Sequence, residues 1–485
     1  MATAEAAAPR RATALPWFPF LPLGVLFLAE AQPQVLQWLF MGAIALLLAL
    51  GVGRLVWAAG ALLVLELTIS NYMLPVAGGN LSLRLAVTGA VLVLLAYHLL
   101  RGARLPKGFL FPVALAFVGA SVATAYLNTD QMQAFKALRF LLSGVTAAAV
   151  VAVGVGSRED LRRLLLVGLT VGSLSAVAAI SQHYSVRLGT PLMAVAPYTG
   201  TGNIYEEMGE RAVGLTENPL HLTDDMLLAL FVLAGIFVSV EMGMLRRWGL
   251  AIAGAAMLAA LYFTYTRSWP PAAAAGAVAF LAYRGPYRRE VWLGLLLLGL
   301  GIFYVSDFRG NRYTLTDDSS ALARPILWQA ALWMSLEHPY MGVGPERFVE
   351  LAPSYDTAVD PQLLREERQL TSRSVLGVYT PHNDYLNVWV TYGLPALGLY
   401  VAMVAGAALC LLTAYRRARD GLLQGVALGL LAALLAYAVN SAFHNYFDSA
   451  LTIWMLVGGA IAVARLVREE GKGGARQAEP RPVSQ

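Results

Sequence analysis

Three polar motifs interrupt a chain that is otherwise mostly apolar. They are ERAVGLTENPLHL, which contains Arg211 and Asn218, YFTYTRSWPP, which contains Arg267, and YTPHNDYLN, which contains His382. An arginine guanidinium is planar and permanently charged, and it binds phosphate oxygens through parallel hydrogen bonds. A neutral imidazole can accept the proton of a hydroxyl group. Together, these residue types could bind a phosphorylated donor and activate an acceptor hydroxyl.

Each of these residues also has a structural interpretation. An arginine at the end of an apolar helix, such as Arg267, can extend to the lipid headgroups. Arg211 lies in a polar segment, where a solvated charge is common. His382 can simply be the neighbour of a helix cap, because Asn383 and Asp384 are residue types that cap helix N-termini. Taken one at a time, the residues leave both interpretations open.

Other polar residues are weaker candidates for the same site. His444, in the motif NSAFHNYFD, is a second candidate base. Arg84, Lys136 and Arg139 could extend a cationic patch, although charges that face water or headgroups are the more common interpretation. The sequence contains no Walker loop, no HExxH motif and no Cys/His pair with metal-ligand spacing. It therefore predicts neither a nucleotide-phosphate loop nor a metal site.

The composition is that of an integral membrane protein. Of the 485 residues, 58% are hydrophobic and 13% are charged, whereas soluble domains carry about 25% charged residues. The basic residues form short clusters between apolar runs, which is how membrane proteins set their orientation, so the net charge of +5 does not indicate a nucleic-acid partner. The single cysteine, Cys410, excludes an intrachain disulfide.

Apolar runs of about 20 residues predict an all-α polytopic protein with about fourteen spans, or about twelve if the short runs are not counted. The alternate connections carry most of the basic residues, which predicts that they and both termini are cytoplasmic. The N-terminus also resembles a signal peptide, but we favour an uncleaved first helix because the next run follows at once. The predicted spans are 16–31, 34–51, 54–74, 81–100, 109–127, 137–155, 161–181, 222–241, 247–265, 270–284, 290–306, 385–413, 421–440 and 449–467.

Two long connections, 182–221 and 307–384, are predicted to lie outside, so the three motifs are expected to converge at the outer interface. In the larger connection we expect a helix that begins at Pro325 and ends at Pro339, and a second helix over 361–372. The resulting regions are a cytoplasmic tail (1–15), a seven-helix membrane region (16–181), a central membrane region with the arginine motifs (182–306), a large periplasmic loop (307–384), C-terminal membrane helices (385–467) and a disordered cytoplasmic tail (468–485).

Four fragments then carry a family resemblance. RAVGLTENPLHL, TYTRSWPPAAAAG, RPILWQAALWMSLEHPYMGVGPERF and PHNDYLNVWVTYGLPALGLY occur in this order within residues 205–450. They resemble the conserved half of the O-antigen ligase and O-antigen polymerase superfamily. The last two fragments, separated by the large outer loop, are the most specific part of the resemblance. The predicted span count exceeds that of the family's ligases.

The resemblance implies a glycosyltransferase of the bacterial inner membrane that acts at its periplasmic face. The donor would be a glycan on undecaprenyl pyrophosphate, with no nucleotide sugar, metal or other cofactor. The family's essential arginines correspond to Arg211 and Arg267, and its essential histidine to His382. Its conserved arginine at the start of the loop helix corresponds to Arg324.

One mechanism is consistent with both the residues and the resemblance. Arg211 and Arg267 would bind the pyrophosphate, and His382 would take the proton of the acceptor hydroxyl as it attacks C1, which inverts the anomeric configuration. A group beside His382, either Asn383 or a carboxylate of Asp384 or Asp448, would orient the imidazole. The residues predicted to bind substrate are Arg324, Asn383, Asn218, Arg139 and Arg84.

The sequence does not identify the acceptor of the glycan. A ligase would transfer the glycan to a lipid A-core-type acceptor, a polymerase to a second lipid-linked repeat unit, and some relatives to a protein. A flippase or exporter of the lipid-linked glycan is an alternative from another class. It would need a cationic path through the bundle, whereas the basic residues here gather near the two surfaces.

Overall fold

The computed structural model describes residues 33–69, 72–76, 79–188, 211–216, 218–283, 288–289, 291–294, 319–370, 374–444, 447 and 450–478. Within these residues it is a helical bundle, as predicted, and eight helices are long and apolar enough to cross a membrane. The helices of the bundle are α2 (Pro33–Gly51), α3 (Val56–Glu66), α4 (Leu83–Leu100), α5 (Leu110–Asn128), α6 (Gln131–Gly154), α7 (Arg158–Leu188), α9 (Pro219–Ser239), α10 (Met244–Phe263), α11 (Trp269–Val278) with the 3₁₀ turn η3 (Ala279–Ala282), α16 (Asp384–Arg417), α17 (Gly421–Asn440) and α18 (Thr452–Ala478).

The helices of the bundle coincide with the predicted spans, with three differences. The span predicted at 54–74 ends as a helix at Glu66, and a short antiparallel hairpin of β1 (Met73–Val76) and β2 (Gly79–Ser82) follows it. The segment TISNYMLPVAGGNLS is too polar and too rich in turn residues to continue a helix. The span predicted at 16–31 lies outside the described residues, and the one at 290–306 lies mostly outside them.

The third difference is at the C-terminus. Helix α18 continues to Ala478, so residues 468–478 are helical rather than disordered as predicted. Contacts with neighbouring helix ends explain the extension. Glu470 accepts hydrogen bonds from the Arg158 guanidinium at 2.9 Å and from the Arg419 backbone N–H at 3.1 Å. Residues 479–485 lie outside the described part of the chain.

Helices α9 and α17 approach each other through glycines. A Cβ at Gly235 would overlap the carbonyl oxygen of Gly425, and one at Gly429 would lie 2.6 Å from the carbonyl oxygen of Phe231. Small residues allow two helix backbones to approach this closely in a membrane. The close packing brings the first turns of α9 next to the end of α17, where the polar residues of both helices meet.

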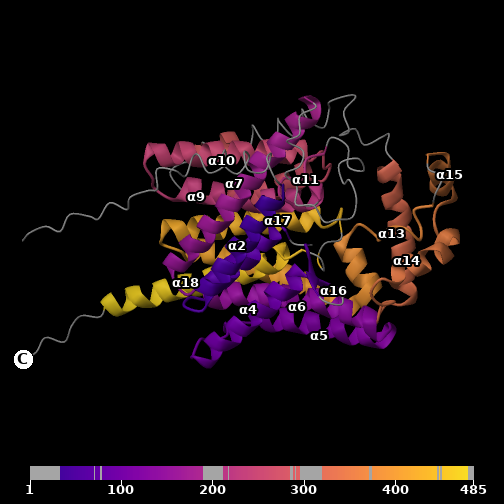
Figure 1. Cartoon of the computed structure of the whole chain (residues 1–485), viewed down its shortest axis with the longest axis horizontal. Helices are drawn as coiled ribbons and strands as arrows, with labels where there is room; N and C mark the ends of the chain where they lie inside the picture. Colours follow the sequence, from indigo (N-terminus) through magenta and orange to yellow (C-terminus); the bar gives the residue numbers. More distant parts are fainter. Residues whose placement is uncertain are drawn as a thin grey trace, which may run out of the picture.

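The large connection between α11 and α16 forms a second, smaller unit at one end of the bundle, to the right in Figure 1. It contains α13 (Ser319–Glu337), α14 (Arg347–Leu351), the 3₁₀ helix η4 (Ala352–Ala358) and α15 (Pro361–Leu370). The prediction that Pro325 begins the first of these helices is wrong, because α13 starts at Ser319 and contains the proline. A proline removes one intrahelical hydrogen bond, and the burial of Ile326, Leu327 and Ala330 in this unit's own core stabilises the helix beyond it.

A break in α16 holds the small unit against the bundle. Gly393 has φ of 85°, a left-handed conformation that favours glycine, and it divides α16 just before Pro395. The freed backbone groups bind the segment that follows α13. Leu394 N–H donates to the carbonyl of Pro339 at 2.7 Å, and Val343 N–H donates to that of Val390 at 2.7 Å.

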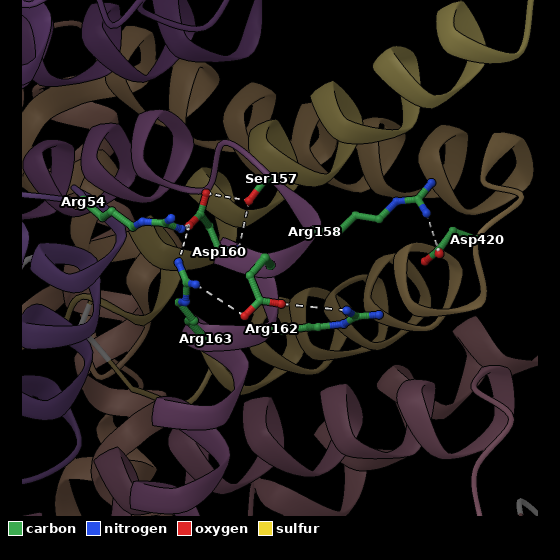
Figure 2. Close-up of polar contacts among 8 residues, drawn as sticks. Arg54, Ser157, Arg158, Asp160, Arg162, Arg163 and Asp420 are labelled. Atoms are coloured by element: carbon green, nitrogen blue, oxygen red, sulfur yellow. Dashed lines mark hydrogen bonds and ion pairs between the residues drawn. The ribbon is translucent and has the colours of Figure 1, made fainter. Parts of the chain in front are cut away.

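Ion pairs join the helix ends at the opposite end of the bundle. Figure 2 shows Arg158, at the start of α7, bound to Asp420 at 2.9 Å, and Asp160 bound to Arg163 at 3.2 Å and to Arg54 at 3.6 Å. In Figure 1 this end lies to the left, where α18 also ends. It is the end that the basic connections predict to be cytoplasmic.

Candidate functional site

The first two motifs meet at the turn between α10 and α11. The Arg211 guanidinium donates from Nε to the carbonyl of Thr264 at 3.0 Å and from Nη2 to Oγ1 of Thr266 at 3.2 Å. The next residue, Ala212, donates its backbone N–H to the carbonyl of Phe263 at 2.9 Å. Arg211 therefore lies against the turn that leads directly into Arg267, although the two arginines are far apart in the sequence.

Two polar side chains of α7 hold the segment that carries Arg211. Gln182 Oε1 accepts the backbone N–H groups of Val213 at 3.1 Å and Gly214 at 2.9 Å, while its Nε2 donates to the Gly214 carbonyl at 2.7 Å. Ser175 Oγ accepts the N–H of Leu215 at 3.1 Å. Sequence reasoning missed both Gln182 and Ser175. The sequence feature that could have identified them is a glutamine and a serine within an apolar run, because buried polar groups need hydrogen-bond partners.

Asn218 begins α9. Its Oδ1 accepts the backbone N–H of Leu220 at 2.8 Å, and Pro219 occupies the first helical position. This is an N-cap, which satisfies one of the unpaired donors at a helix start. The contact explains why an asparagine stands here, and the binding of substrate by Asn218 stays a prediction.

His382 lies where the third motif turns into α16. Its φ of 49° is unusual for a residue with a side chain, and such strain persists only where surrounding contacts hold it. The next residue, Asn383, caps α16 by accepting the N–H of Leu386 at 3.1 Å. The ring of Tyr379 lies 5.9 Å from the imidazole, centroid to centroid. His382 therefore precedes a well-formed helix start at the end of the bundle that carries the small unit.

The carboxylate of Asp384 faces the bundle. One oxygen accepts the Tyr437 hydroxyl at 3.1 Å, and the other accepts the backbone N–H of Phe447 at 3.3 Å. The backbone N–H of Asp384 donates to the carbonyl of Ser441 at 2.8 Å. These bonds join the start of α16 to the end of α17 and to the connection between α17 and α18. Asp448, the other carboxylate considered for orienting His382, lies outside the described residues.

His444 lies in this same connection and forms a buried pair. Its Nε2 is 3.0 Å from Oδ2 of Asp224 on α9, and Asn440 Nδ2 donates to the other oxygen of Asp224 at 2.6 Å. Burial disfavours the charged imidazolium, but the charge and hydrogen bond of Asp224 and the charge of Asp384 together outweigh it, so the pKa of His444 is raised above its usual value. At this distance the two side chains form an ion pair when the imidazole is protonated.

Buried carboxylates of three helices thus hold the connection between α17 and α18. Asp224 of α9 binds His444, Asp384 of α16 binds Phe447, and Glu66 of α3 accepts the backbone N–H of Leu451 at 2.7 Å. Because α9 follows the Arg211 segment and α16 follows His382, this connection links the arginine side of the candidate site to the histidine side.

The remaining predicted site residues lie in different surroundings. Arg324 of α13 lies over the ring of Phe443 at 5.9 Å, so it reaches the same connection from the small unit. Arg84 is buried in the bundle and binds Glu66 at 3.0 Å, and Arg139 lies over the ring of Phe140 at 4.7 Å. Substrate binding by each of them stays a prediction.

The comparison with protein families adds an independent finding. Residues 252–401 match the family model described as O-antigen ligase. This segment, about a third of the chain, is therefore similar to the O-antigen ligase family. The family implies an enzyme that transfers glycosyl groups, with a lipid-linked glycan and an acceptor as substrates. A comparison with curated proteins found no match.

The O-antigen ligase domain contains only part of the candidate site. Arg267, Arg324 and His382 lie within its limits, whereas Arg211 precedes it and His444 follows it. The supporting contacts also come from outside, because Gln182 and Asp224 lie on α7 and α9. Helices that precede the domain thus hold the two segments that flank it, the one with Arg211 and the one with His444.

Proposed function

We propose that this protein is an inverting, metal-independent glycosyltransferase of the bacterial inner membrane. It transfers a glycan from undecaprenyl pyrophosphate to a lipid A-core-type acceptor at the periplasmic face. The observation that carries the proposal is the contact of Arg211 with the turn before Arg267. It brings two cationic motifs together in a chain whose O-antigen ligase domain also contains His382.

The arginines act on the donor. As the bond between C1 and the phosphate oxygen breaks, the electron pair leaves with the pyrophosphate and its negative charge grows. Arg211 and Arg267 stabilise that charge, and guanidinium groups suit this role because they stay ionised and present paired donors. The bonds of Arg211 to Thr264 and Thr266 hold the guanidinium in place before the donor binds, so less ordering is needed in the transition state.

His382 acts on the acceptor. A neutral imidazole nitrogen takes the proton of the acceptor hydroxyl while the hydroxyl oxygen attacks C1 from the face opposite the pyrophosphate. Attack from that face inverts the anomeric configuration. Asn383 holds the backbone at this point through its cap on α16, and Arg324 of α13 lies on the acceptor side.

A reconstituted reaction tests the proposal. Purified protein would receive a lipid-pyrophosphate-linked repeat unit in a buffer with a metal chelator, with or without a lipid A-core acceptor, and products would be resolved on a gel. Transfer that requires the separate acceptor is expected, together with its loss in His382→Ala. A ladder formed from the donor alone would show polymerase activity instead. Full activity of His382→Ala would show that this residue is not the base.

A further inference from the structure

A cavity of about 300 Å³ opens at the end of the bundle opposite the candidate site. It lies between the connection before α5, the last turns of α16 and the middle of α18. Most of its wall is apolar, and includes Phe109, Leu110 and Ile461. Its polar lining includes three basic side chains, Lys107, Arg417 and Arg468, from three separate parts of the chain.

These three cations differ from Arg158 and Arg163 at the same end of the bundle. Arg158 and Arg163 bind carboxylates directly, as Figure 2 shows. Among the described residues, by contrast, no ion pair to Lys107, Arg417 or Arg468 is found, and no carboxylate lines the cavity. Cations gathered around one cavity repel one another unless an anion lies between them. The cavity is therefore complementary in charge to an anion.

The rest of the wall indicates which kind of anion. Arg417 is the last residue of α16 and Leu110 the first of α5, so the basic side chains stand at the level of the helix ends, where headgroups lie. The apolar wall continues from there along α16 and α18, through residues such as Leu409 and Ile461. A small soluble anion would gain nothing from contact with the apolar wall. A phospholipid, by contrast, has an anionic headgroup that suits the basic side chains and acyl chains that suit the apolar wall.

We propose that this cavity binds one anionic phospholipid. The phosphodiester would lie between Lys107, Arg417 and Arg468, and the first part of an acyl chain would lie against Leu110 and Ile461. This site is separate from the site of glycosyl transfer, and the inference does not depend on the proposed reaction. If the basic connections set the orientation, the bound lipid belongs to the cytoplasmic leaflet.

Lipid retention tests the inference directly. The purified protein would be mixed with phosphatidylglycerol or phosphatidylcholine, and bound lipids would be measured by native mass spectrometry. We expect one retained phosphatidylglycerol, and about a hundredfold weaker retention when Lys107, Arg417 and Arg468 are all replaced by Gln. The matched control replaces Arg104, Arg246 and Arg416 by Gln. These arginines are exposed, as the three cavity cations are, but they lie outside the cavity, so this variant should retain the lipid. Equal retention by both triple variants would overturn the proposal.

Cys410 provides a second readout, because the single cysteine of the chain also lines the cavity. In phosphatidylcholine nanodiscs, adding phosphatidylglycerol should slow its labelling by a small maleimide, and the Lys107/Arg417/Arg468 variant should not show this protection. Inorganic phosphate should give none. If inorganic phosphate protected Cys410 from labelling as strongly as the lipid does, the cavity would be a site for a soluble anion and not for a phospholipid.

Discussion

Two residues with left-handed backbone adjoin the polar groups of the candidate site. Tyr265, with φ of 48°, lies between the two threonines that bind Arg211, and His382 itself has φ of 49°. Strain of this kind costs about 1–3 kcal/mol for each residue and is retained where the surrounding structure enforces it. Both therefore belong to segments whose shape is imposed by neighbours.

The proposed binding of pyrophosphate by Arg211 and Arg267 gives the first prediction. Arg267→Lys keeps the charge but loses the planar fork, so we expect initial rates of glycosyl transfer to fall about a hundredfold or more. Arg246→Lys is the control, because that arginine is exposed at the other end of α10. Equal rates for wild type and Arg267→Lys would mean that charge alone matters at this position.

The pair of His444 and Asp224 gives a prediction about pH. Asp224 and Asp384 raise the pKa of His444, while burial and Arg324 lower it, and the net result is a raised value. A raised pKa stabilises the folded state most below the pKa of an unfolded histidine, and this contribution is lost as pH rises through the raised pKa. Thermal unfolding at a series of pH values should show this loss in wild type.

Variants distinguish the pH dependence of stability that comes from this pair from that of other titrating groups. Removing one partner of a buried pair costs about 3–5 kcal/mol, so His444→Gln and Asp224→Asn should both be less stable than wild type at low pH and should lack the pH-dependent step. The double variant should lose less than the sum of the two single changes, because the residues interact. Additive losses, or a step that persists in His444→Gln, would contradict the ion pair.

At the scale of elements, the break in α16 is the junction between the bundle and the small unit. The break needs Gly393 for its left-handed φ and because a Cβ there would overlap the carbonyl of Tyr340. The hydrogen bonds of Leu394 and Val343 across this junction fix α13 relative to the segment that carries His382.

Replacing the glycine tests this junction. Gly393→Ala should destabilise the protein by at least about 1–3 kcal/mol from backbone strain alone, and limited proteolysis should cut residues 319–370 faster. Gly398→Ala, in the same helix, is the matched control, since a Cβ at Gly398 would meet no atom within 4 Å. Similar proteolysis of the two variants would show that the small unit is held by other contacts.

At the scale of the whole molecule, the two ends of the bundle differ. The candidate site lies at one end, and the basic connections lie at the other. The predicted orientation can be measured by placing a cysteine at each end in a Cys410→Ala background. Ser354 and Glu241 are exposed at opposite ends. A membrane-impermeant maleimide should label Ser354→Cys in intact spheroplasts, and Glu241→Cys only after permeabilisation. The reverse pattern would invert the orientation and place the candidate site on the cytoplasmic side.

The sequence by itself determined the helical class, the approximate limits of most of the described helices and the position of the three motifs at helix ends. These properties depend on local hydrophobicity and on the types of neighbouring residues, which can be read without knowing which helices touch. The same reasoning failed at the hairpin of β1 and β2 and at Pro325. In the first case a polar segment interrupted a predicted span, and in the second tertiary packing extended a helix past a proline.

Only the tertiary structure decided which polar groups meet. Arg211 binds Thr264 and Thr266, and Asp224 binds His444, across long separations in the sequence. Such contacts depend on which helices pack together and how closely, as the glycines between α9 and α17 illustrate. A buried polar group must find a partner, but the composition of its own segment does not determine which partner it finds.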